Sequence, residues 1–185
     1  MERPVIFSAD MVLAILAGRK TQTRRVVKLP RWFLQEYPRV SAYEIQKEVR
    51  CPYGQPGDRL WVRETWRPVA SGGLEYRASE TNHALNSKKW RSPIFMPRAY
   101  SRLTLELTDV RVEQVQEIDE GGAKSEGFQD YLERFNIPRD GSISWYAKAA
   151  FVDYWNELHG AGNFREQNPW VWVLTFKIVD NTGGH

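Results

Sequence analysis

The pattern of apolar and polar positions divides the chain into short strands separated by loops, with few helices. Val5-Ile6-Phe7 predicts a strand, and Ser8 is a good N-cap for a helix over residues 9–17. Gly18 follows as a helix end. A second helical pattern predicts a helix over residues 144–159, where apolar positions recur at helical spacing.

Strand patterns occupy much of the remaining chain. Trp, Val and Thr predict a strand over residues 59–66, and a shorter one is predicted over 74–78. Regular alternation over residues 102–117 predicts a long strand or a hairpin. Residues 170–179 are apolar on both faces, which indicates a strand inside the sheet rather than at its edge.

Several regions lack clean periodicity. Residues 29–57 contain four prolines and predict an irregular excursion with at most one short helix, of the kind that often faces a substrate. Residues 79–92 predict a polar loop, and residues 119–135 predict a short helix interrupted by glycines. Strands of irregular spacing with interspersed helices favour an α+β, barrel-like fold over a doubly wound parallel sheet.

The composition limits the classes of protein to consider. The chain has 185 residues, of which 42% are apolar, enough for one sizeable core, so we expect a single domain over residues 1–185. No apolar run reaches the roughly 20 residues of a membrane span, and the mean hydropathy is −0.57. Because Met1-Glu2-Arg3-Pro4 leads directly into the first strand without the pattern of a secretory signal, we expect a cytoplasmic protein without membrane association.

The cysteine and histidine content gives no sign of a metal or cofactor. Cys51 is the single cysteine, in a turn-like segment, and we interpret it as a bystander rather than a nucleophile. The histidines His83, His159 and His185 are scattered without metal-ligand spacing. We therefore predict no disulfide, no metal site and no cofactor.

Charge and aromatic residues suggest an anionic partner. Residues 19–50 hold nine Lys or Arg against three Glu, whereas residues 102–134 hold four Lys or Arg against nine Asp or Glu. Eight Trp, eight Tyr and eight Phe accompany this distribution. Aromatic rings beside a cationic groove suit stacked bases and phosphates, although most of these rings are expected in the core.

The segment from Gly18 to Arg25 carries the strongest chemical signal. It places Lys20 and Thr23 three residues apart where a helix runs into a basic loop. A lysine beside other cations loses part of its proton affinity, and a neutral amine can activate a nearby hydroxyl as a nucleophile. The alternative is structural, because cations after a helix also complement its negative dipole end.

Glu64 is the candidate acid. Alternation places it on the face of the 59–66 strand that carries Leu60, Val62 and Trp66. Loss of water around a carboxyl group on such a face would raise its pKa and make it a usable proton donor. Pairing with a nearby arginine as a buried structural ion pair is equally consistent with the strand, and the sequence leaves both readings open.

These motifs together resemble those of the ASCH superfamily. The resemblance rests on Gly18-x-Lys20-x-x-Thr23-x-Arg25 after the first helix, on the Gly57-Asp58 turn before a strand leading to Glu64, and on the late apolar strand. It implies a PUA-like open β-barrel with flanking helices and long inserted loops. Its cleft would take RNA or a nucleoside.

One branch of the superfamily consists of small N4-acetylcytidine amidohydrolases with a Thr-Lys-Glu set. Carried onto this chain by motif, that set is Thr23, Lys20 and Glu64. The substrate expected from this resemblance is an N4-acylated cytosine nucleoside or RNA. Candidates for contacts to the ribose, phosphate or cytosine ring are Arg24, Arg25, Trp66, Tyr146 and Trp170.

Two other functions fit the same residues. A ribonuclease could use Lys and Glu in a basic groove to activate a 2′-hydroxyl and protonate the leaving group. An RNA-binding module would use the same groove for shape and stacking recognition without chemistry. Binding dominated by phosphate contacts would weaken steeply with salt, which separates it from action on a free nucleoside. The excursion over residues 29–57 and the added region over residues 79–141 exceed what a minimal amidohydrolase needs.

Overall fold

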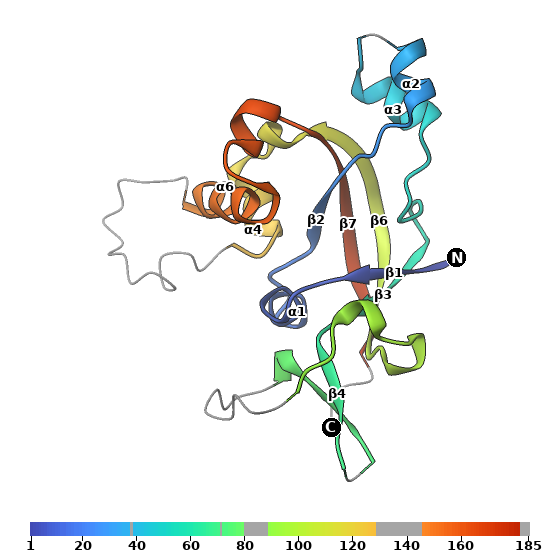
Figure 1. Cartoon of the computed structure of the whole chain (residues 1–185), viewed down its shortest axis with the longest axis vertical. Coiled ribbons are helices and arrows are strands. Elements are labelled where there is room, and N and C mark those ends of the chain that lie inside the picture. The colour runs from blue at the N-terminus through green and yellow to red at the C-terminus, as the bar shows by residue number, and fades with distance from the viewer. Residues whose placement is uncertain (38, 71, 80–88, 129–145, 182–185) are drawn as a thin grey trace.

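The computed structural model describes residues 1–37, 39–70, 72–79, 89–128 and 146–181 (Figure 1). Its framework is a five-stranded sheet with the order β1-β3-β6-β7-β2, in which β1 and β3 run parallel and the other neighbours antiparallel. The neighbouring strands are mostly antiparallel and the helices come between them at irregular intervals along the chain, which fits the predicted α+β class. The five strands are β1 Glu2–Ile6, β2 Gln22–Val26, β3 Arg59–Arg63, β6 Leu103–Gln114 and β7 Trp170–Asn181.

β7 separates two hydrophobic clusters, because consecutive side chains of a strand point to opposite faces of the sheet. Trp172 and Leu174 enter the larger cluster, together with residues from β3, β6 and the first helix. Val171 and Val173 enter the smaller cluster, under the helical flank. Since β7 lies between β6 and β2, the prediction of an interior strand that is apolar on both faces is confirmed.

The first helix forms where its capping signals predict it. α1 spans Ala9–Leu16, and the Ser8 hydroxyl accepts a hydrogen bond from the Met11 N–H at 3.4 Å. Gly18 has a φ of +71°, a left-handed conformation that glycine adopts at little cost. Val12 and Ile15 anchor the helix in the larger cluster, so its end delivers the loop after Gly18 to a fixed place.

Two helices form the flank beside β7 and β2. α4 spans Glu120–Ser125 and α6 spans Tyr146–His159, and Figure 1 shows them packed together on one side of the sheet. Phe151 and Trp155 of α6 are buried in the smaller cluster. Both predicted helices are therefore present within the described residues, but α4 continues through Gly121 and Gly122, where an interruption was predicted. Residues 129–145, parts of both predictions, lie outside the described residues.

The excursion over residues 29–57 contains two helices, so the expectation of at most one was wrong. α2 spans Arg31–Glu36 and α3 spans Ala42–Glu48. α3 starts with a capping box in which the Ser41 hydroxyl accepts from the Glu44 N–H and the Glu44 carboxylate accepts from the Ser41 N–H. This local signal, rather than hydrophobic periodicity, specifies the second helix.

One strand prediction also needs correction. The predicted strand over 59–66 divides at Glu64, just after the end of β3, and the chain turns into β4 (Trp66–Pro68), which pairs with β5 (Leu74–Tyr76) in a separate two-stranded sheet. Of the two alternatives predicted for residues 102–117, the long strand is confirmed: Leu103–Gln114 form one strand, β6, with two register irregularities against β7. Short helical turns complete the described elements: Arg77–Ser79, Pro93–Phe95, Arg98–Tyr100, Val115–Glu117 and Asn163–Gln167.

The two outer strands of the sheet approach each other at one end. The Arg25 guanidinium of β2 donates a hydrogen bond to the carbonyl oxygen of Ile6, the last residue of β1, at 2.7 Å. The sheet order nevertheless keeps β1 and β2 at opposite ends of the sheet. The space between these strands contains the candidate site. Among the described residues, no helix is long and apolar enough to cross a bilayer.

Candidate functional site

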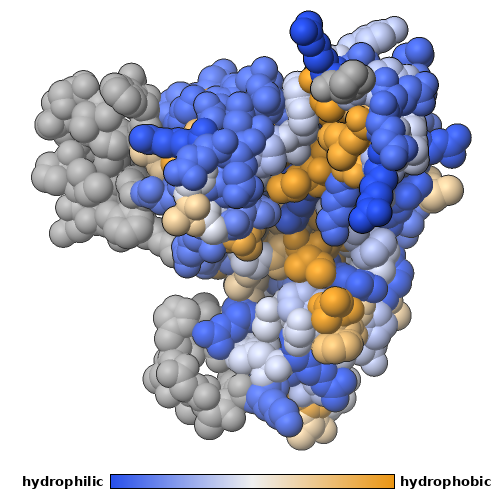
Figure 2. Space-filling model, turned by 45° about the horizontal axis from the view of Figure 1, so that its top comes forward, coloured by the Kyte–Doolittle hydropathy of each residue, from blue (hydrophilic) through white to orange (hydrophobic). Residues whose placement is uncertain are grey.

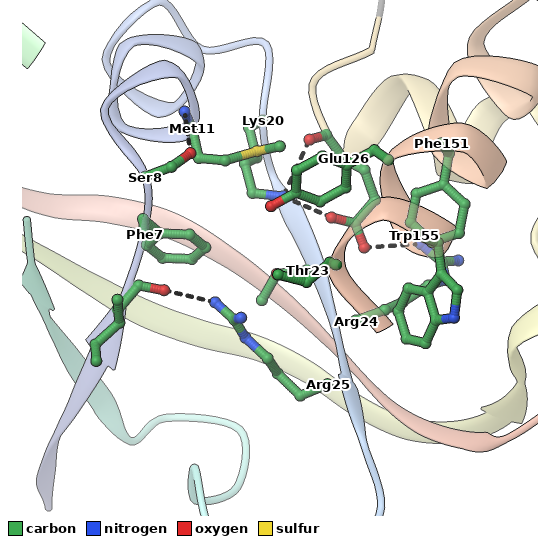
Figure 3. A pocket seen from close by; sticks show the side chains of 13 residues that line it. Phe7, Ser8, Met11, Lys20, Thr23, Arg24, Arg25, Glu126, Phe151 and Trp155 are labelled. Atoms are coloured by element: carbon green, nitrogen blue, oxygen red, sulfur yellow. Dashed lines mark hydrogen bonds and ion pairs between the residues drawn. The ribbon is translucent and has the colours of Figure 1, made fainter. Parts of the chain in front are cut away.

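A pocket lies between the end of β1, the start of α1, β2 and α6 (Figure 3). It brings together the basic loop after α1 and the aromatic face of α6, which are far apart in the sequence. Its polar lining includes the two central residues of the sequence motif, Lys20 and Thr23. The remaining lining residues are Ile6, Phe7, Ser8, Met11, Arg24, Arg25, Glu126, Phe151, Tyr154, Trp155 and Leu158.

Lys20 is almost completely buried, with 2% of its surface exposed. Its Nζ donates to three acceptors: the Gln22 carbonyl oxygen at 2.8 Å, the Glu126 carbonyl oxygen at 3.0 Å and the Glu126 carboxylate at 2.6 Å. The loop is fixed by its backbone as well, because the Thr21 N–H donates to the Ser125 carbonyl oxygen at 2.8 Å. The amine is therefore held against the end of α4 rather than in solvent.

Burial lowers the pKa of Lys20 from its ordinary value of 10.5. The Glu126 carboxylate opposes this by raising the pKa, while the nearby guanidinium groups of Arg25 and Arg24 lower it further. Desolvation is the largest cause, because an ammonium group loses its hydration shell in the interior. The proton shared by Lys20 and Glu126 is thus held less firmly by the amine than in an exposed lysine.

Glu126 is the acidic residue that contacts Lys20. One carboxylate oxygen accepts from Lys20, and the other accepts from Arg24 Nη1 at 3.3 Å. The following residue, Gly127, has a φ of +100°, and a Cβ there would lie 3.1 Å from the Ala14 Cβ and 3.3 Å from the Lys20 Cβ. Both conformation and space therefore favour glycine beside this carboxylate.

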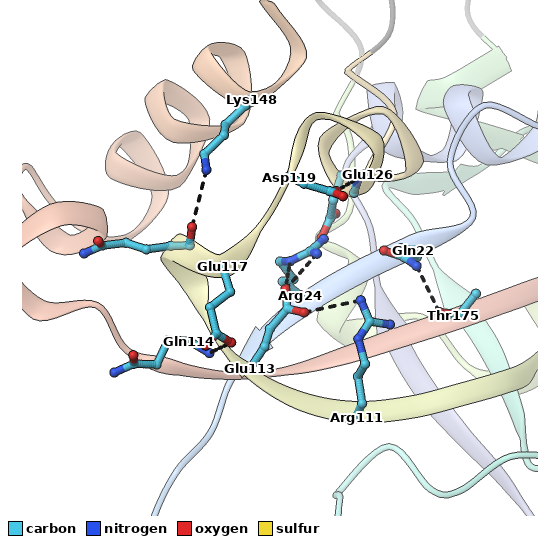
Figure 4. A network of polar contacts seen from close by, with 12 residues as sticks. Gln22, Arg24, Arg111, Glu113, Gln114, Glu117, Asp119, Glu126, Lys148 and Thr175 are labelled. Carbon is cyan, nitrogen blue, oxygen red and sulfur yellow. Dashed lines mark hydrogen bonds and ion pairs between the residues drawn. The ribbon is translucent and has the colours of Figure 1, made fainter. Parts of the chain in front are cut away.

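Arg24 links Glu126 to a second carboxylate (Figure 4). Its Nε donates to Glu113 at 2.8 Å, and Glu113 also accepts from Arg111 at 3.3 Å. The Arg24 side chain is buried, and a Cβ on Gly122 would come within 2.9 Å of its Nη2. Arg24, expected to contact a substrate, thus has its guanidinium in a network with protein carboxylates.

Thr23 and Arg25 lie on β2 at the pocket. Thr23 is buried and pairs with Leu174 of β7 in the strand ladder. The Arg25 guanidinium carbon lies 5.2 Å from the centre of the Phe7 ring, and Lys20 Nζ lies 5.6 Å from the same ring. A cationic group and an apolar ring are thus available at one wall of the pocket, next to the threonine.

Glu64 does not line this pocket, contrary to the expected convergence with Lys20. It is 1% exposed and accepts two hydrogen bonds from Arg102, from Nε at 2.8 Å and from Nη2 at 2.9 Å. Glu64 is therefore in a buried ion pair with an arginine, the second of the two alternatives that the sequence left open. The physical reason is the break after β3, which directs the chain at Glu64 into the β4–β5 hairpin, away from β2.

The aromatic residues at the pocket also differ from those expected. Trp66 is buried against Tyr100 beside the hairpin, and Trp170 packs at the edge of the larger cluster. The side chain of Tyr146 lies outside the described residues. The rings that line the pocket are Phe7, Phe151, Tyr154 and Trp155. Three of these lie on the helical stripe of α6, a pattern that predicts core packing and gives no separate signal for a pocket.

No protein-family model matches the sequence, and no curated protein matches it. The solved structures that are similar to the chain include the following two. An ASCH domain from Lactobacillus crispatus is 19% identical with a TM-score of 0.42, over 97% of this chain and 80% of that one. A protein from Enterococcus faecalis, described by the family model DUF984, is 13% identical with a TM-score of 0.42, over 100% of this chain and 86% of that one. Neither similarity indicates an activity for this chain.

Proposed function

We propose that this protein is an amidohydrolase that removes the acyl group from N4-acylated cytosine nucleosides, with Lys20, Thr23 and Glu126 as its reacting residues. The observation that carries the proposal is the 2.6 Å contact between a buried amine and a buried carboxylate at a pocket that a threonine also lines. Such a pair can accept a proton and return it within one catalytic cycle.

The first step needs a base for the threonine hydroxyl. With the proton of the pair on Glu126, Lys20 is a neutral amine, a form that its burial favours. Lys20 then takes the proton from Thr23 as the hydroxyl oxygen attacks the acyl carbon. The tetrahedral intermediate carries a negative oxygen, which the nearby cationic groups of Lys20 and Arg25 stabilise.

The second step breaks the bond between the acyl carbon and N4. N4 takes a proton from Glu126, cytidine leaves, and the acyl group remains as an ester on Thr23. Water then attacks the ester and gives one proton to the Glu126 carboxylate. The bond between the acyl carbon and the Thr23 oxygen breaks, Lys20 returns its proton to that oxygen, and the free acid leaves. The net reaction is one amide and one water converted to cytidine and a carboxylic acid, with all three side chains restored.

The surroundings of the pair suit a cytosine ring. Phe7, Phe151 and Trp155 supply apolar ring surface, and Arg25 supplies a donor for a ribose oxygen. The position of the pocket between the two outer strands is the one that an open barrel of the PUA-like type would offer. The sheet order and the Arg25–Ile6 hydrogen bond support that description of the fold.

The test is release of cytidine from N4-acetylcytidine, followed by chromatography. Lys20→Met and Thr23→Val keep the side-chain volumes nearly constant and should each lower kcat/KM at least a hundredfold, as loss of a base or a nucleophile does. Lys28→Met and Thr21→Val are matched controls, because Lys28 and Thr21 are exposed, and both should keep full activity.

Thermal melting of each variant separates loss of chemistry from loss of fold. Activity that persists in both pocket variants while they remain folded would exclude this set of residues. A wild type that leaves N4-acetylcytidine intact but shortens labelled RNA without metal would instead favour the ribonuclease alternative. Action on the free nucleoside should depend little on salt, because phosphate contacts are absent.

A further inference from the structure

A second region of the molecule combines arginines with aromatic rings. We call it the hairpin lobe: residues 64–70, 72–79 and 89–102, which include β4, β5 and the turns that follow. Four rings in or beside this lobe each have at least one guanidinium group over them. These are Trp61 under Arg63 at 4.6 Å and Arg98 at 6.0 Å, Trp66 under Arg91 at 5.1 Å, Trp90 under Arg67 at 5.2 Å and Arg77 at 5.6 Å, and Tyr76 under Arg102 at 4.2 Å.

Tyr100 joins two of these rings into one group. Its ring lies edge-on to Trp66 with the centres 4.9 Å apart, and its carbonyl oxygen accepts a hydrogen bond from the Tyr76 hydroxyl at 2.9 Å. Arg91 and Trp66 are also paired through their backbones. These three rings and the guanidinium groups of Arg91 and Arg102 therefore form one connected group.

The turns after residue 90 present apolar side chains to solvent. Met96 is buried and anchors this segment, where its sulfur accepts from the Glu64 N–H at 3.3 Å. Beside this anchor, Phe95 is 74% exposed, Ile94 is 57% exposed and Tyr100 is 38% exposed. Figure 2 shows hydrophobic side chains at the surface of the lower part of the molecule, which carries the lobe. Large apolar groups fixed outward beside polar ones are typical of a contact surface.

The charge of the lobe specifies the kind of partner. Its described residues include six Lys or Arg and two Glu. Both carboxylates are paired with arginines of the lobe, Glu64 with Arg102 and Glu75 with Arg67. Residues 89–102 contain no acidic residue. Lys89 and Arg91 are exposed, and Arg98 is exposed but paired with Glu2 of β1 at 3.0 Å. The exposed face is thus cationic around its apolar side chains.

We propose that the hairpin lobe binds single-stranded nucleic acid, at a site separate from the pocket that contains Lys20. Unpaired bases would stack on Phe95 and Tyr100, and on the outer planes of guanidinium groups that the rings beneath them hold flat. Arg91 and Lys89 would contact backbone phosphates. A duplex keeps its bases stacked on one another, so it would leave the exposed rings without a partner. The proposal is independent of the amidohydrolase activity.

The experiment measures the fluorescence anisotropy of a labelled 12-nucleotide RNA of mixed sequence, and of DNA of the same sequence, at several salt concentrations. Phe95→Ala removes stacking and should weaken binding about 5- to 150-fold without changing the salt dependence. Arg91→Ala removes a phosphate contact and should lower the slope of log affinity against log salt by about 0.7. A contact that depends only on shape, or a general effect of charge, would not give one variant with unchanged salt dependence and another with a lower slope.

A matched control is available in the excursion over residues 29–57. Tyr43 is 71% exposed and Arg31 is exposed, so Tyr43→Ala and Arg31→Ala remove the same kinds of group from another basic region. Both controls should bind like the wild type. Phe95→Ala should keep full activity on N4-acetylcytidine and Lys20→Met should keep full RNA affinity, so failure of one proposal is distinguishable from failure of the other.

Four outcomes would overturn the proposal. They are absence of binding by the wild type, equal affinity for duplex and single strand, a larger effect of the Tyr43 and Arg31 variants than of the lobe variants, and a dimer that Phe95→Ala dissociates while RNA has no effect. The last would assign the exposed rings to a protein contact. Equal binding of RNA and DNA supports the site and indicates that it does not read the 2′-hydroxyl.

Discussion

Glu64 and Glu126 are both buried carboxylates paired with cations, yet their surroundings differ. Both oxygens of Glu64 face Arg102, whose guanidinium carbon lies 4.2 Å from the centre of the Tyr76 ring. The oxygens of Glu126 face two different cations, Lys20 and Arg24, at the wall of a pocket. Burial and pairing are therefore common to both, and the identity of the cation and access to a pocket distinguish them.

The difference between lysine and arginine has a chemical consequence. An arginine keeps its proton at any accessible pH, so the Glu64–Arg102 pair can only hold two charges together. Burial lowers the pKa of Lys20, so this amine gives up its proton more readily than an exposed lysine, whereas an arginine does not. The lysine pair is therefore better suited to exchange protons with a substrate, which makes Glu126 the better candidate for the acid of the proposed reaction.

The largest expected effect is on activity. Glu126→Gln keeps the shape of the side chain but removes its proton chemistry, and should lower kcat/KM for N4-acetylcytidine by about 10²- to 10⁴-fold. Glu64→Gln keeps an oxygen for Arg102 and should change kcat/KM by less than about threefold, since the pocket is not altered. Steady-state kinetics of the two variants compare them directly. Equal losses in both, or a larger loss in Glu64→Gln at unchanged stability, would reverse the assignment.

Stability should show the opposite order. Glu64→Ala leaves the Arg102 guanidinium buried without its carboxylate, and should lower the free energy of unfolding by about 3–5 kcal/mol. Glu126→Ala should cost less, about 1–3 kcal/mol, because Lys20 can give up its proton and Arg24 keeps Glu113. Urea unfolding at neutral pH measures both values.

The double variant Glu64→Ala/Arg102→Met tests the reason for this order. Removal of both charges should recover part of the stability lost in Glu64→Ala, because no buried charge is left unpaired. If Glu126→Ala proves as destabilising as Glu64→Ala, the lysine does not relieve its charge by losing a proton, and the proposed neutral form loses its support.

The pH dependence of stability should differ between Lys20 and Arg102, the cations paired with Glu126 and Glu64. Folding lowers the pKa of Lys20 from 10.5, so between the lowered pKa and 10.5 the unfolded chain binds more protons than the folded one. The free energy of unfolding of the wild type, relative to Lys20→Met, should therefore rise with pH in that window, by at most about 1.4 kcal/mol per pH unit. The same comparison with Arg102→Met should be flat. Urea melts from neutral to alkaline pH give both slopes, and a falling slope for Lys20 would contradict the pKa direction.

The local structure around the site was predictable from short signals. Ser8 and Gly18 define the ends of α1, and with them the place of Lys20. The apolar run of β7 defines an interior strand on which β2 and Thr23 are aligned. The capping box of Ser41 and Glu44 was equally readable, and the second helix of the excursion was missed because periodicity was given more weight than caps.

Short sequence signals did not predict which residue pairs with each buried charge. Lys20 and Glu126 are 106 residues apart, and Glu64 and Arg102 are 38 apart. Hydrophobic periodicity indicates which face of an element is buried, but it does not indicate which distant segment covers that face. Glu126 follows a helix that contains Gly121 and Gly122, where no alternation points to a buried carboxylate. The contact of Glu126 with Lys20 depends on the β-bridge between these two residues, which joins the loop after α1 to the end of α4.

The smallest expected effect concerns Glu113, which does not itself line the pocket but contacts Arg24, a residue that does. Glu113→Gln weakens the hold on Arg24 Nε, so Arg24 interacts more strongly with the Glu126 carboxylate. The value of kcat/KM should fall about two- to tenfold, the range of a net hydrogen bond of about 0.5–1.5 kcal/mol.

Arg111→Met is the matched control for this change. Arg111 contacts the other oxygen of Glu113 and is partly exposed, so its loss should leave kcat/KM nearly unchanged. Equal losses of kcat/KM in Glu113→Gln and Arg111→Met would contradict a route through Arg24, because among the described residues only Glu113 contacts both arginines. An increase of kcat/KM in Glu113→Gln would mean that a stronger contact between Arg24 and Glu126 favours the reaction rather than slowing it.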